Sequence, residues 1–318
     1  MKTKKTILVL SALAAVCFSS CEKNEEAGAD NGAVRFTAAI GHEAVATPKS
    51  RAAGTTWHGG DALGIFMMNH GSTTTIAFGA ANRQFTTAKD DGLFTPADAE
   101  NAIYYPMDNT SVDFIAYYPY EAGATLGTGL AVQIPTTQDD ASQRATDLLW
   151  ARADNNGPGY TKDQDATIPV ALSFAHQLAK LTMNCTVDAS VGDASLLADA
   201  TVTIRGMYTA STFDLSTGSL SGTPATSAHI TARRPAATTA GSDDTFDAII
   251  LPATYPADAL QVDFNLSGET FTWDVKAVTF QPGHEYIYEV IITRTGVTAT
   301  GTIAPWTPVV KDRPVYVE

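Results

Sequence analysis

Apolar and polar residues alternate along most of the chain beyond residue 30. The alternating segments are short, rich in Val, Ile, Thr, Phe and Tyr, and separated by Gly, Pro, Asn and Asp. Because successive side chains of a strand point to opposite faces, this pattern predicts half-buried strands. We expect strands at residues 34–40, 62–68, 101–104, 112–118, 130–134, 166–174, 178–187, 200–206, 248–251, 261–266, 269–275, 286–293 and 297–302.

The predicted strands are too many for one sandwich domain, which holds about seven strands in roughly 100 residues. No long segment has the 3.6-residue period of a helix. Short helical turns are expected at residues 96–100 and 195–198, and residues 139–165 are predicted to form a loop. We therefore predict an all-β protein with two antiparallel Greek-key sandwiches in tandem, at residues 52–170 and 171–318.

A basic segment and a short apolar run begin the chain. Lys2, Lys4 and Lys5 precede the apolar residues 7–18, which are too few to cross a bilayer. This arrangement predicts a secretory signal peptide over residues 1–20, and hence an exported protein.

Cys21 follows Ser19 and Ser20 at the end of that run. Small residues before a cysteine resemble a bacterial lipobox, in which the cysteine becomes the lipidated first residue. We predict lipidation of Cys21; the alternative is an ordinary signal peptide with an incidental cysteine. The acids at positions 22, 25 and 26 resemble the tag that sends Bacteroidetes lipoproteins to the outer face of the outer membrane.

The amino-acid composition limits the classes of molecule that the protein can bind. The whole chain has 20 Lys and Arg against 34 Asp and Glu; without the three leader lysines the balance is 17 against 34, a net charge of −17. Such a surface repels nucleic acid and anionic lipid, so we expect no nucleic-acid partner. Cys17 leaves with the leader and Cys21 carries lipid, so Cys185 has no cysteine to pair with. The exported chain must therefore be stabilised by burial rather than by disulfides.

The sequence contains no recognisable motif for catalysis or metal binding. The chain has no nucleophile elbow, phosphate loop, dinucleotide fingerprint or zinc-binding helix, and its six histidines are widely scattered. We predict that the protein is not an enzyme and uses no cofactor or metal.

Several residues have a structural and a functional interpretation, and we favour the structural one for each. His176 is expected to be a buried histidine bonded to backbone, with a ligand or pH switch as the alternative. Cys185 alternates with apolar residues and is expected to be buried and unreactive. The acid pairs at 139–140 and 243–244 are expected to be solvated loop residues rather than calcium ligands. The tyrosines at 104–105 and 117–120 are expected to pack in the core rather than bind sugar.

A series of short sequence blocks runs in order along the chain, from about residue 34 to 306. The blocks are Trp57, Gly60-Asp61, Leu63-Gly64-Ile65-Phe66, Val112, Phe114, Ala116-Tyr117-Tyr118-Pro119, Asp147-Leu148-Leu149-Trp150, Leu172, Phe174, His176, Leu178-Ala179-Lys180-Leu181, Gly283, Tyr286, Tyr288 and Ile303 to Trp306. Each block alone is weak, but their order resembles the fimbrillin family, the type V pilins of Bacteroidetes. Known members fold as two transthyretin-like β-sandwiches, so the resemblance implies that fold here.

The resemblance gives a role to the segment between Cys21 and Trp57. A half-buried strand is predicted here, whose inward residues are Val34, Phe36, Ala38 and Ile40, and a polar, small-residue stretch at 47–54 follows it. In type V pilins a trypsin-like, arginine-specific protease removes such a strand, and a strand from another subunit fills the groove. Arg51-Ala52 matches that site, which implies a lipid-anchored propeptide over residues 21–51. The alternative is a permanently anchored, uncleaved lipoprotein.

The tail at 307–318 resembles the C-terminal segment with which fimbrillin shaft subunits fill a neighbour's groove. Val315 and Val317 alternate as a donor strand requires, but Pro308, Pro314 and the charges at 311–313 weaken the match.

We therefore predict a structural subunit of cell-surface fimbriae that supports adhesion. It is anchored in the outer membrane as a precursor, and its partners are other fimbrial subunits and the protease. The main alternative is a monomeric outer-membrane lipoprotein that binds glycan or a host protein through its loops, and a lipid-anchored hydrolase is a more remote one.

Overall fold

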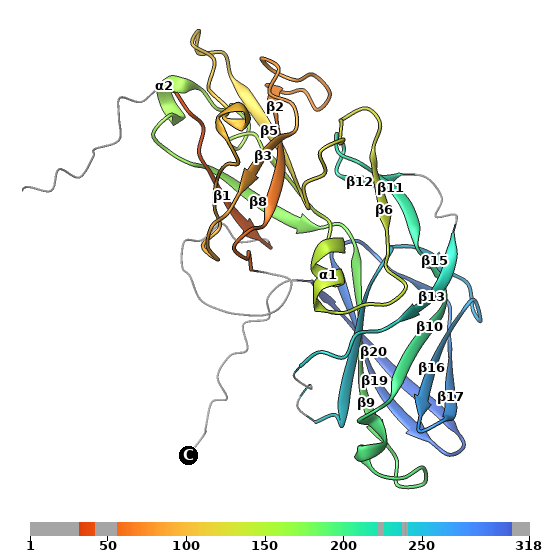
Figure 1. Cartoon of the computed structure of the whole chain (residues 1–318). Coiled ribbons are helices and arrows are strands. Elements are labelled where there is room, and N and C mark those ends of the chain that lie inside the picture. The colour runs from red at the N-terminus through yellow and green to blue at the C-terminus, as the bar shows by residue number, and fades with distance from the viewer. Residues whose placement is uncertain (1–31, 42–55, 222–225, 237–238, 240, 307–318) are drawn as a thin grey trace, which may run out of the picture. The chain divides into compact units, whose positions relative to one another are not determined.

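The chain is described here by a computed structural model that covers residues 32–41, 56–221, 226–236, 239 and 241–306. The all-β prediction is confirmed, and the strands lie in several sheets (Figure 1). No helix in these ranges is both long and apolar enough to cross a membrane. The helical elements are α1 (Asp140–Thr146), α2 (Lys162–Asp165), η1 (Ala99–Asn101) and η2 (Ala194–Leu197).

Seven strands close into a barrel in the order β1-β4-β3-β2-β5-β7-β8. The strand β1 closes the ring, because it pairs antiparallel with β4 and parallel with β8. Phenylalanine and aliphatic side chains fill the interior. The strands are β1 (Phe36–Ile40), β2 (Ala62–Asn69), β3 (Arg83–Thr86), β4 (Leu93–Pro96), β5 (Val112–Tyr118), β7 (Leu149–Ala153) and β8 (Val170–His176).

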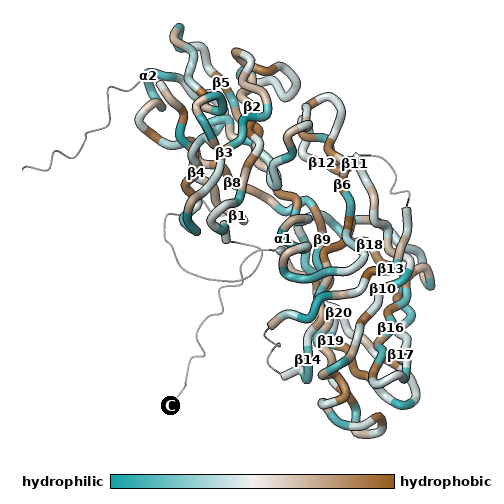
Figure 2. The backbone as a smooth tube through the Cα atoms, viewed as in Figure 1, coloured by the Kyte–Doolittle hydropathy of each residue, from teal (hydrophilic) through white to brown (hydrophobic). Residues whose placement is uncertain are grey.

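Two four-stranded sheets and two smaller ones enclose a second apolar cluster, which includes Met183, Val202, Phe246 and Phe264. Figure 2 shows that many of the hydrophobic residues lie along the strands. One sheet has β13 (Ser227–Thr231), β10 (Thr201–Tyr208), β16 (Leu260–Leu266) and β17 (Glu269–Val275). The other has β14 (Asp244–Ile250), β9 (Ala179–Val187), β19 (His284–Thr293) and β20 (Gly296–Pro305). The smaller sheets have β12 (Ser219–Ser221), β11 (Ala210–Asp214) and β6 (Leu130–Gln133), and β15 (Thr254–Tyr255) and β18 (Val278–Thr279).

The strand β2 is buried on both faces, which explains its nearly unbroken apolar sequence. Ile65 and Met67 face the barrel interior, whereas Phe66 and Met68 belong to the second cluster. Gly64 is required here, because a Cβ at this position would lie 2.1 Å from the ring of Tyr117.

The structure corrects two sequence predictions about local elements. Residues 101–104 do not form a strand; instead the Asp98 side chain caps the start of η1, which ends at Asn101. The predicted loop at 139–165 instead contains α1, β7 and α2, and a capping box between Asp139 and Ser142 starts α1. Hydroxyl and acidic residues are as common in helix caps as in loops, so composition misled the prediction.

Candidate functional site

The strand β1 occupies a slot between β4 and β8 and is held there by backbone hydrogen bonds on both sides. Ala38 N donates to Gly92 O at 2.8 Å, and Val170 N donates to Arg35 O at 2.8 Å. At the ends of the slot, Val34 N donates to Ile103 O and Gly41 N donates to Phe174 O, each at 2.9 Å. Without β1, both β4 and β8 would present an unpaired strand edge, which is a template for another strand.

The inward side chains of β1 fill the centre of the barrel. Phe36 is fully buried, with its ring edge-on to Phe85 at 5.0 Å and to Phe114 at 5.1 Å between centroids. Val34 and Ala38 are also buried, while Ile40 is half-buried at the rim. Three of the four predicted groove-facing residues are therefore core residues of this barrel.

Trp57 contacts β1 from a distant part of the sequence. Its indole Nε1 donates a buried hydrogen bond of 2.8 Å to the carbonyl of Ala38. The ring lies edge-on to Phe94 and Phe174, at 5.0 Å and 5.3 Å between centroids. Sequence reasoning missed this bond, because nothing local indicates which carbonyl a tryptophan reaches.

The backbone of the slot approaches β1 closely at Gly92. This residue has a φ of +71°, and a Cβ there would lie 2.4 Å from the carbonyl oxygen of Ala38. A substitution would be strained by the backbone conformation and would push β1 away.

Five predicted site residues lie outside the described residues. They are Cys21, Arg51, Ala52, Val315 and Val317.

His176 is buried as expected, but it bonds to a carboxylate rather than to backbone. Its Nδ1 lies 2.8 Å from Asp147 Oδ1, and its ring stacks on Trp306 with centroids 3.9 Å apart. The Nε2 atom is buried without a hydrogen-bond partner. Asp147 lies 29 positions away in the sequence, so nothing near His176 in the chain indicated that its partner would be a carboxylate.

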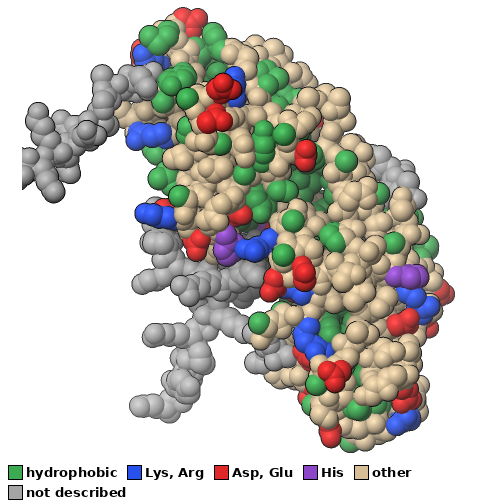
Figure 3. Space-filling view, viewed as in Figure 1, with side chains coloured by type: hydrophobic (Ala, Val, Ile, Leu, Met, Phe, Trp, Pro, Cys, Tyr) green, Lys and Arg blue, Asp and Glu red, His purple; other side chains and the backbone are tan. Residues whose placement is uncertain are grey.

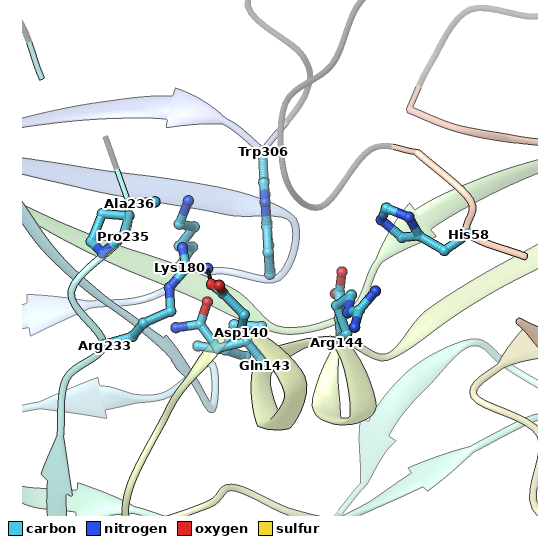
Figure 4. A pocket seen from close by; sticks show the side chains of 11 residues that line it. His58, Asp140, Gln143, Arg144, Lys180, Arg233, Pro235, Ala236 and Trp306 are labelled. Carbon is cyan, nitrogen blue, oxygen red and sulfur yellow. Dashed lines mark hydrogen bonds and ion pairs between the residues drawn. The ribbon is translucent and has the colours of Figure 1, made fainter. Parts of the chain in front are cut away.

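Near this histidine, a cavity of about 540 Å³ lies between α1, β9 and the end of β20. Figure 4 shows Trp306 standing between Lys180 on one side and Arg144 with His58 on the other. Arg233 pairs with Asp247, and Lys180 lies 3.5 Å from Asp247 and 3.4 Å from Glu285. Because carboxylates balance these cations, the cavity has no clear preference for an anion.

A second buried charge lies on the barrel strand β5. Asp113 is fully buried and accepts hydrogen bonds from Gly71 N at 2.9 Å and Arg152 at 3.1 Å, and it lies 2.9 Å from His70 Nδ1. Burial alone would raise the pKa of this carboxyl, but the hydrogen bonds of His70, Gly71 and Arg152 outweigh it and hold the pKa below its usual value.

The acid pairs were predicted to be solvated loop residues, and all four acids have structural partners. Asp139 caps α1, and Asp140 pairs with Arg233. Asp243 accepts from Val187 N at 2.8 Å, and Asp244 pairs with Arg234 at 3.0 Å. Asp139, Asp140 and Asp243 are nevertheless exposed, as predicted, whereas Asp244 is half-buried.

The cysteine and tyrosine predictions have different outcomes. Cys185 is buried, as predicted, and burial raises the pKa of its thiol. Tyr105 and Tyr117 are core residues as expected, whereas Tyr104 is 49% exposed.

Comparison with known proteins gives concordant matches over nearly the whole chain. A family model described as fimbrillin-like matches residues 50–306. A protein of Bacteroides uniformis, described as fimbrium subunit Fim1C, is 32% identical over 318 residues, covering 96% of each chain.

Solved structures also share the fold. A crystal structure from Bacteroides uniformis, described as a cell adhesion protein, is 29% identical, with a TM-score of 0.67 over 87% of this chain and 98% of that one. Another from Bacteroides ovatus has the same coverage, a TM-score of 0.65 and 21% identity.

Proposed function

The chain belongs to the fimbrillin-like family, and we propose that it is a fimbrial subunit that is exported as a lipoprotein and polymerises by strand exchange. In this proposal Cys21 carries the lipid, and an arginine-specific protease cuts between Arg51 and Ala52. The cut detaches residues 21–51, which include β1. Another subunit then supplies the strand that takes its place.

The observation that carries the proposal is the position of β1 in the barrel. This strand lies upstream of Arg51 in the chain, so cleavage there leaves it attached only by non-covalent contacts. Its departure would leave three vacancies at once: two unpaired strand edges, a hole where Phe36 was, and an indole N–H of Trp57 without its acceptor. A strand with alternate apolar side chains satisfies all three.

Finer features belong to the same proposal. These are two transthyretin-like Greek-key sandwiches divided near residue 170, an outer-membrane anchor before cleavage, and donor residues Val315 and Val317 in the tail. The two apolar clusters support a division into two cores, although β6 pairs with β11 across the proposed boundary.

The alternative, a monomeric surface lipoprotein that binds glycan or host protein through its loops, has one supporting observation. Tyr104 presents an exposed aromatic ring, as sugar-binding sites do. This alternative requires that β1 stays in place.

The direct test is cleavage of the purified precursor with an arginine-specific protease, followed by size analysis in cold detergent. We expect a cut after Arg51 and detergent-resistant polymers, and no polymers from Arg51→Ala. Tryptophan emission should shift to longer wavelength when β1 leaves, because Trp57 becomes exposed to water, and should return as polymers form. A chain that is cut at Arg51, loses residues 21–51 and remains monomeric at high concentration would contradict strand exchange.

A further inference from the structure

A strongly exposed apolar surface lies at one end of the β1 slot. Phe78, Tyr104 and Met107 are 66%, 49% and 80% exposed, and all three line an apolar cavity of about 590 Å³. The cavity has one cation and one carboxylate in its lining, Arg83 and Asp108. In Figure 3, hydrophobic side chains are exposed at several places on the surface over the barrel, in the upper part of the view. We name the Phe78, Tyr104 and Met107 side chains the apical patch.

The apical patch is continuous with the slot. Residues 32–34 leave the barrel by pairing with residues 103–105: Val34 N donates to Ile103 O, Tyr105 N donates to Gly32 O, and Ala33 bridges Tyr104. A strand that replaces β1 and follows the same path therefore reaches the apical patch.

The turn that carries Phe78 is unfavourable for a phenylalanine. Ala80 N donates to Ala77 O at 3.0 Å, and the two central residues, Phe78 and Gly79, have φ values of +48° and +71°. Turns with two positive φ values favour Asn, Asp and Gly, and a bulky residue there is strained. Phe78 is mostly exposed, so burial in the monomer does not compensate for this strain.

Arg83 holds the turn in place beside the cavity. Its guanidinium donates to Gly79 O at 3.3 Å and to Glu100 O at 2.6 Å. The aromatic ring is thus presented on a fixed support, as the anchor residues of protein interfaces are.

The two ends of the slot differ in chemistry. Where Ile40 ends β1, the neighbouring cavity is lined by His58, Asp61, Arg144 and Asp147. The apical end is mainly apolar. Two copies of a chain in which acids outnumber bases can meet at the apical patch without bringing many carboxylates together.

We propose that the apical patch is the surface on which the body of the next subunit, a second copy of this chain, rests when its strand enters the slot. This inference rests on the proposed function, since it assumes strand exchange. It adds a second contact, with Phe78 as an anchor, to the backbone pairing inside the slot.

The test compares elongation rates of cleaved wild-type chain with those of Phe78→Asn and Met107→Gln, measured by light scattering. Asparagine tolerates a positive φ, so Phe78→Asn should keep or raise the thermal midpoint of the precursor while slowing elongation about tenfold or more. Met107→Gln should slow elongation as well. The matched control is Ile303→Gln, which alters a 62% exposed side chain on β20 and should elongate as the wild type does.

The outcomes separate the two proposals. Wild-type polymers with variants that elongate at the wild-type rate would overturn the apical patch and leave strand exchange standing. Cleaved wild-type chain that never polymerises would overturn both. Normal elongation with a loss of precursor binding to phosphatidylcholine vesicles in Phe78→Asn would assign the surface to the membrane instead.

Discussion

At the scale of single residues, the contacts that matter most join positions far apart in the sequence. The alternation at 34–40 predicted that Phe36 is buried, because strand periodicity is a local property. Three sets of hydrogen bonds were not predictable: Trp57 with Ala38, His176 with Asp147, and Asp113 with its three partners. Each depends on which strands become neighbours, and a single sequence does not encode that in its local pattern.

Asp113 gives a prediction about pH. Because its pKa is lowered in the folded protein, its ionised form stabilises the fold above the ordinary value of 3.8, and this contribution is lost as the pH falls through the lower folded value. The replacement Asp113→Asn should therefore destabilise the precursor at neutral pH. The difference in free energy of unfolding between variant and wild type should shrink as the pH falls below about 4. Urea titrations at several pH values measure it; a constant difference would contradict the charge-based account.

At the scale of elements, most long strands were predicted and most short ones were not, although the four-residue β6 was. The bounds of β5 and β17 agree with the sequence prediction, because β17 alternates buried and exposed residues and β5 is a long, mostly apolar run. β3 and β4 have four residues each, too few for a period to be recognised. The sequence therefore predicts the half-buried strand that fills the slot and a strand overlapping β8 on one side of it. It does not predict β4 on the other side.

The element β1 gives a prediction about stability. The replacement Phe36→Asp puts a carboxylate among phenylalanine rings, and should lower the free energy of unfolding of the precursor by at least about 3 kcal/mol. The control Thr37→Asp changes an exposed residue of the same strand and should have little effect. After cleavage and loss of residues 21–51, variant and parent have the same sequence, so their melting should be identical. Equal melting of the Phe36→Asp and parent precursors would show that β1 contributes nothing to stability.

At the scale of the whole molecule, the family and the all-β class followed from the sequence, whereas the closed barrel did not. Ring closure depends on the parallel pairing of β1 with β8, two strands that are far apart in the sequence. A hairpin turn can be recognised from local residues, but the pairing of two such distant strands cannot. The apical patch could not be predicted from the sequence either. Tyr104 and Met107 were visible in the sequence, but the positive φ of Phe78 and the exposure of all three belong to the folded chain.

The tail gives a prediction about assembly. Residues 307–318 lie outside the described residues, and their proposed role as donor comes from the family resemblance. Deleting them should leave the precursor folded and exported, with an unchanged melting temperature. After cleavage at Arg51 the truncated chain should fail to polymerise alone, yet should accept a strand from full-length chains, as seen by co-sedimentation with their polymers. Long fibres of truncated chain alone would place the donor elsewhere.

The parallel pairing of β1 with β8 also sets an order of events during folding. Arg35 bonds to Thr167, 132 positions away, so the strand made first must wait for a partner made much later. Closing so long a loop is a slow step, and it comes after the hairpins that form between neighbouring strands. We therefore expect β1 to be the last strand of the barrel to dock. Until β1 docks, the edges of β4 and β8 stay unpaired, so we expect the folding chain to be most prone to pairing with other strands in that interval.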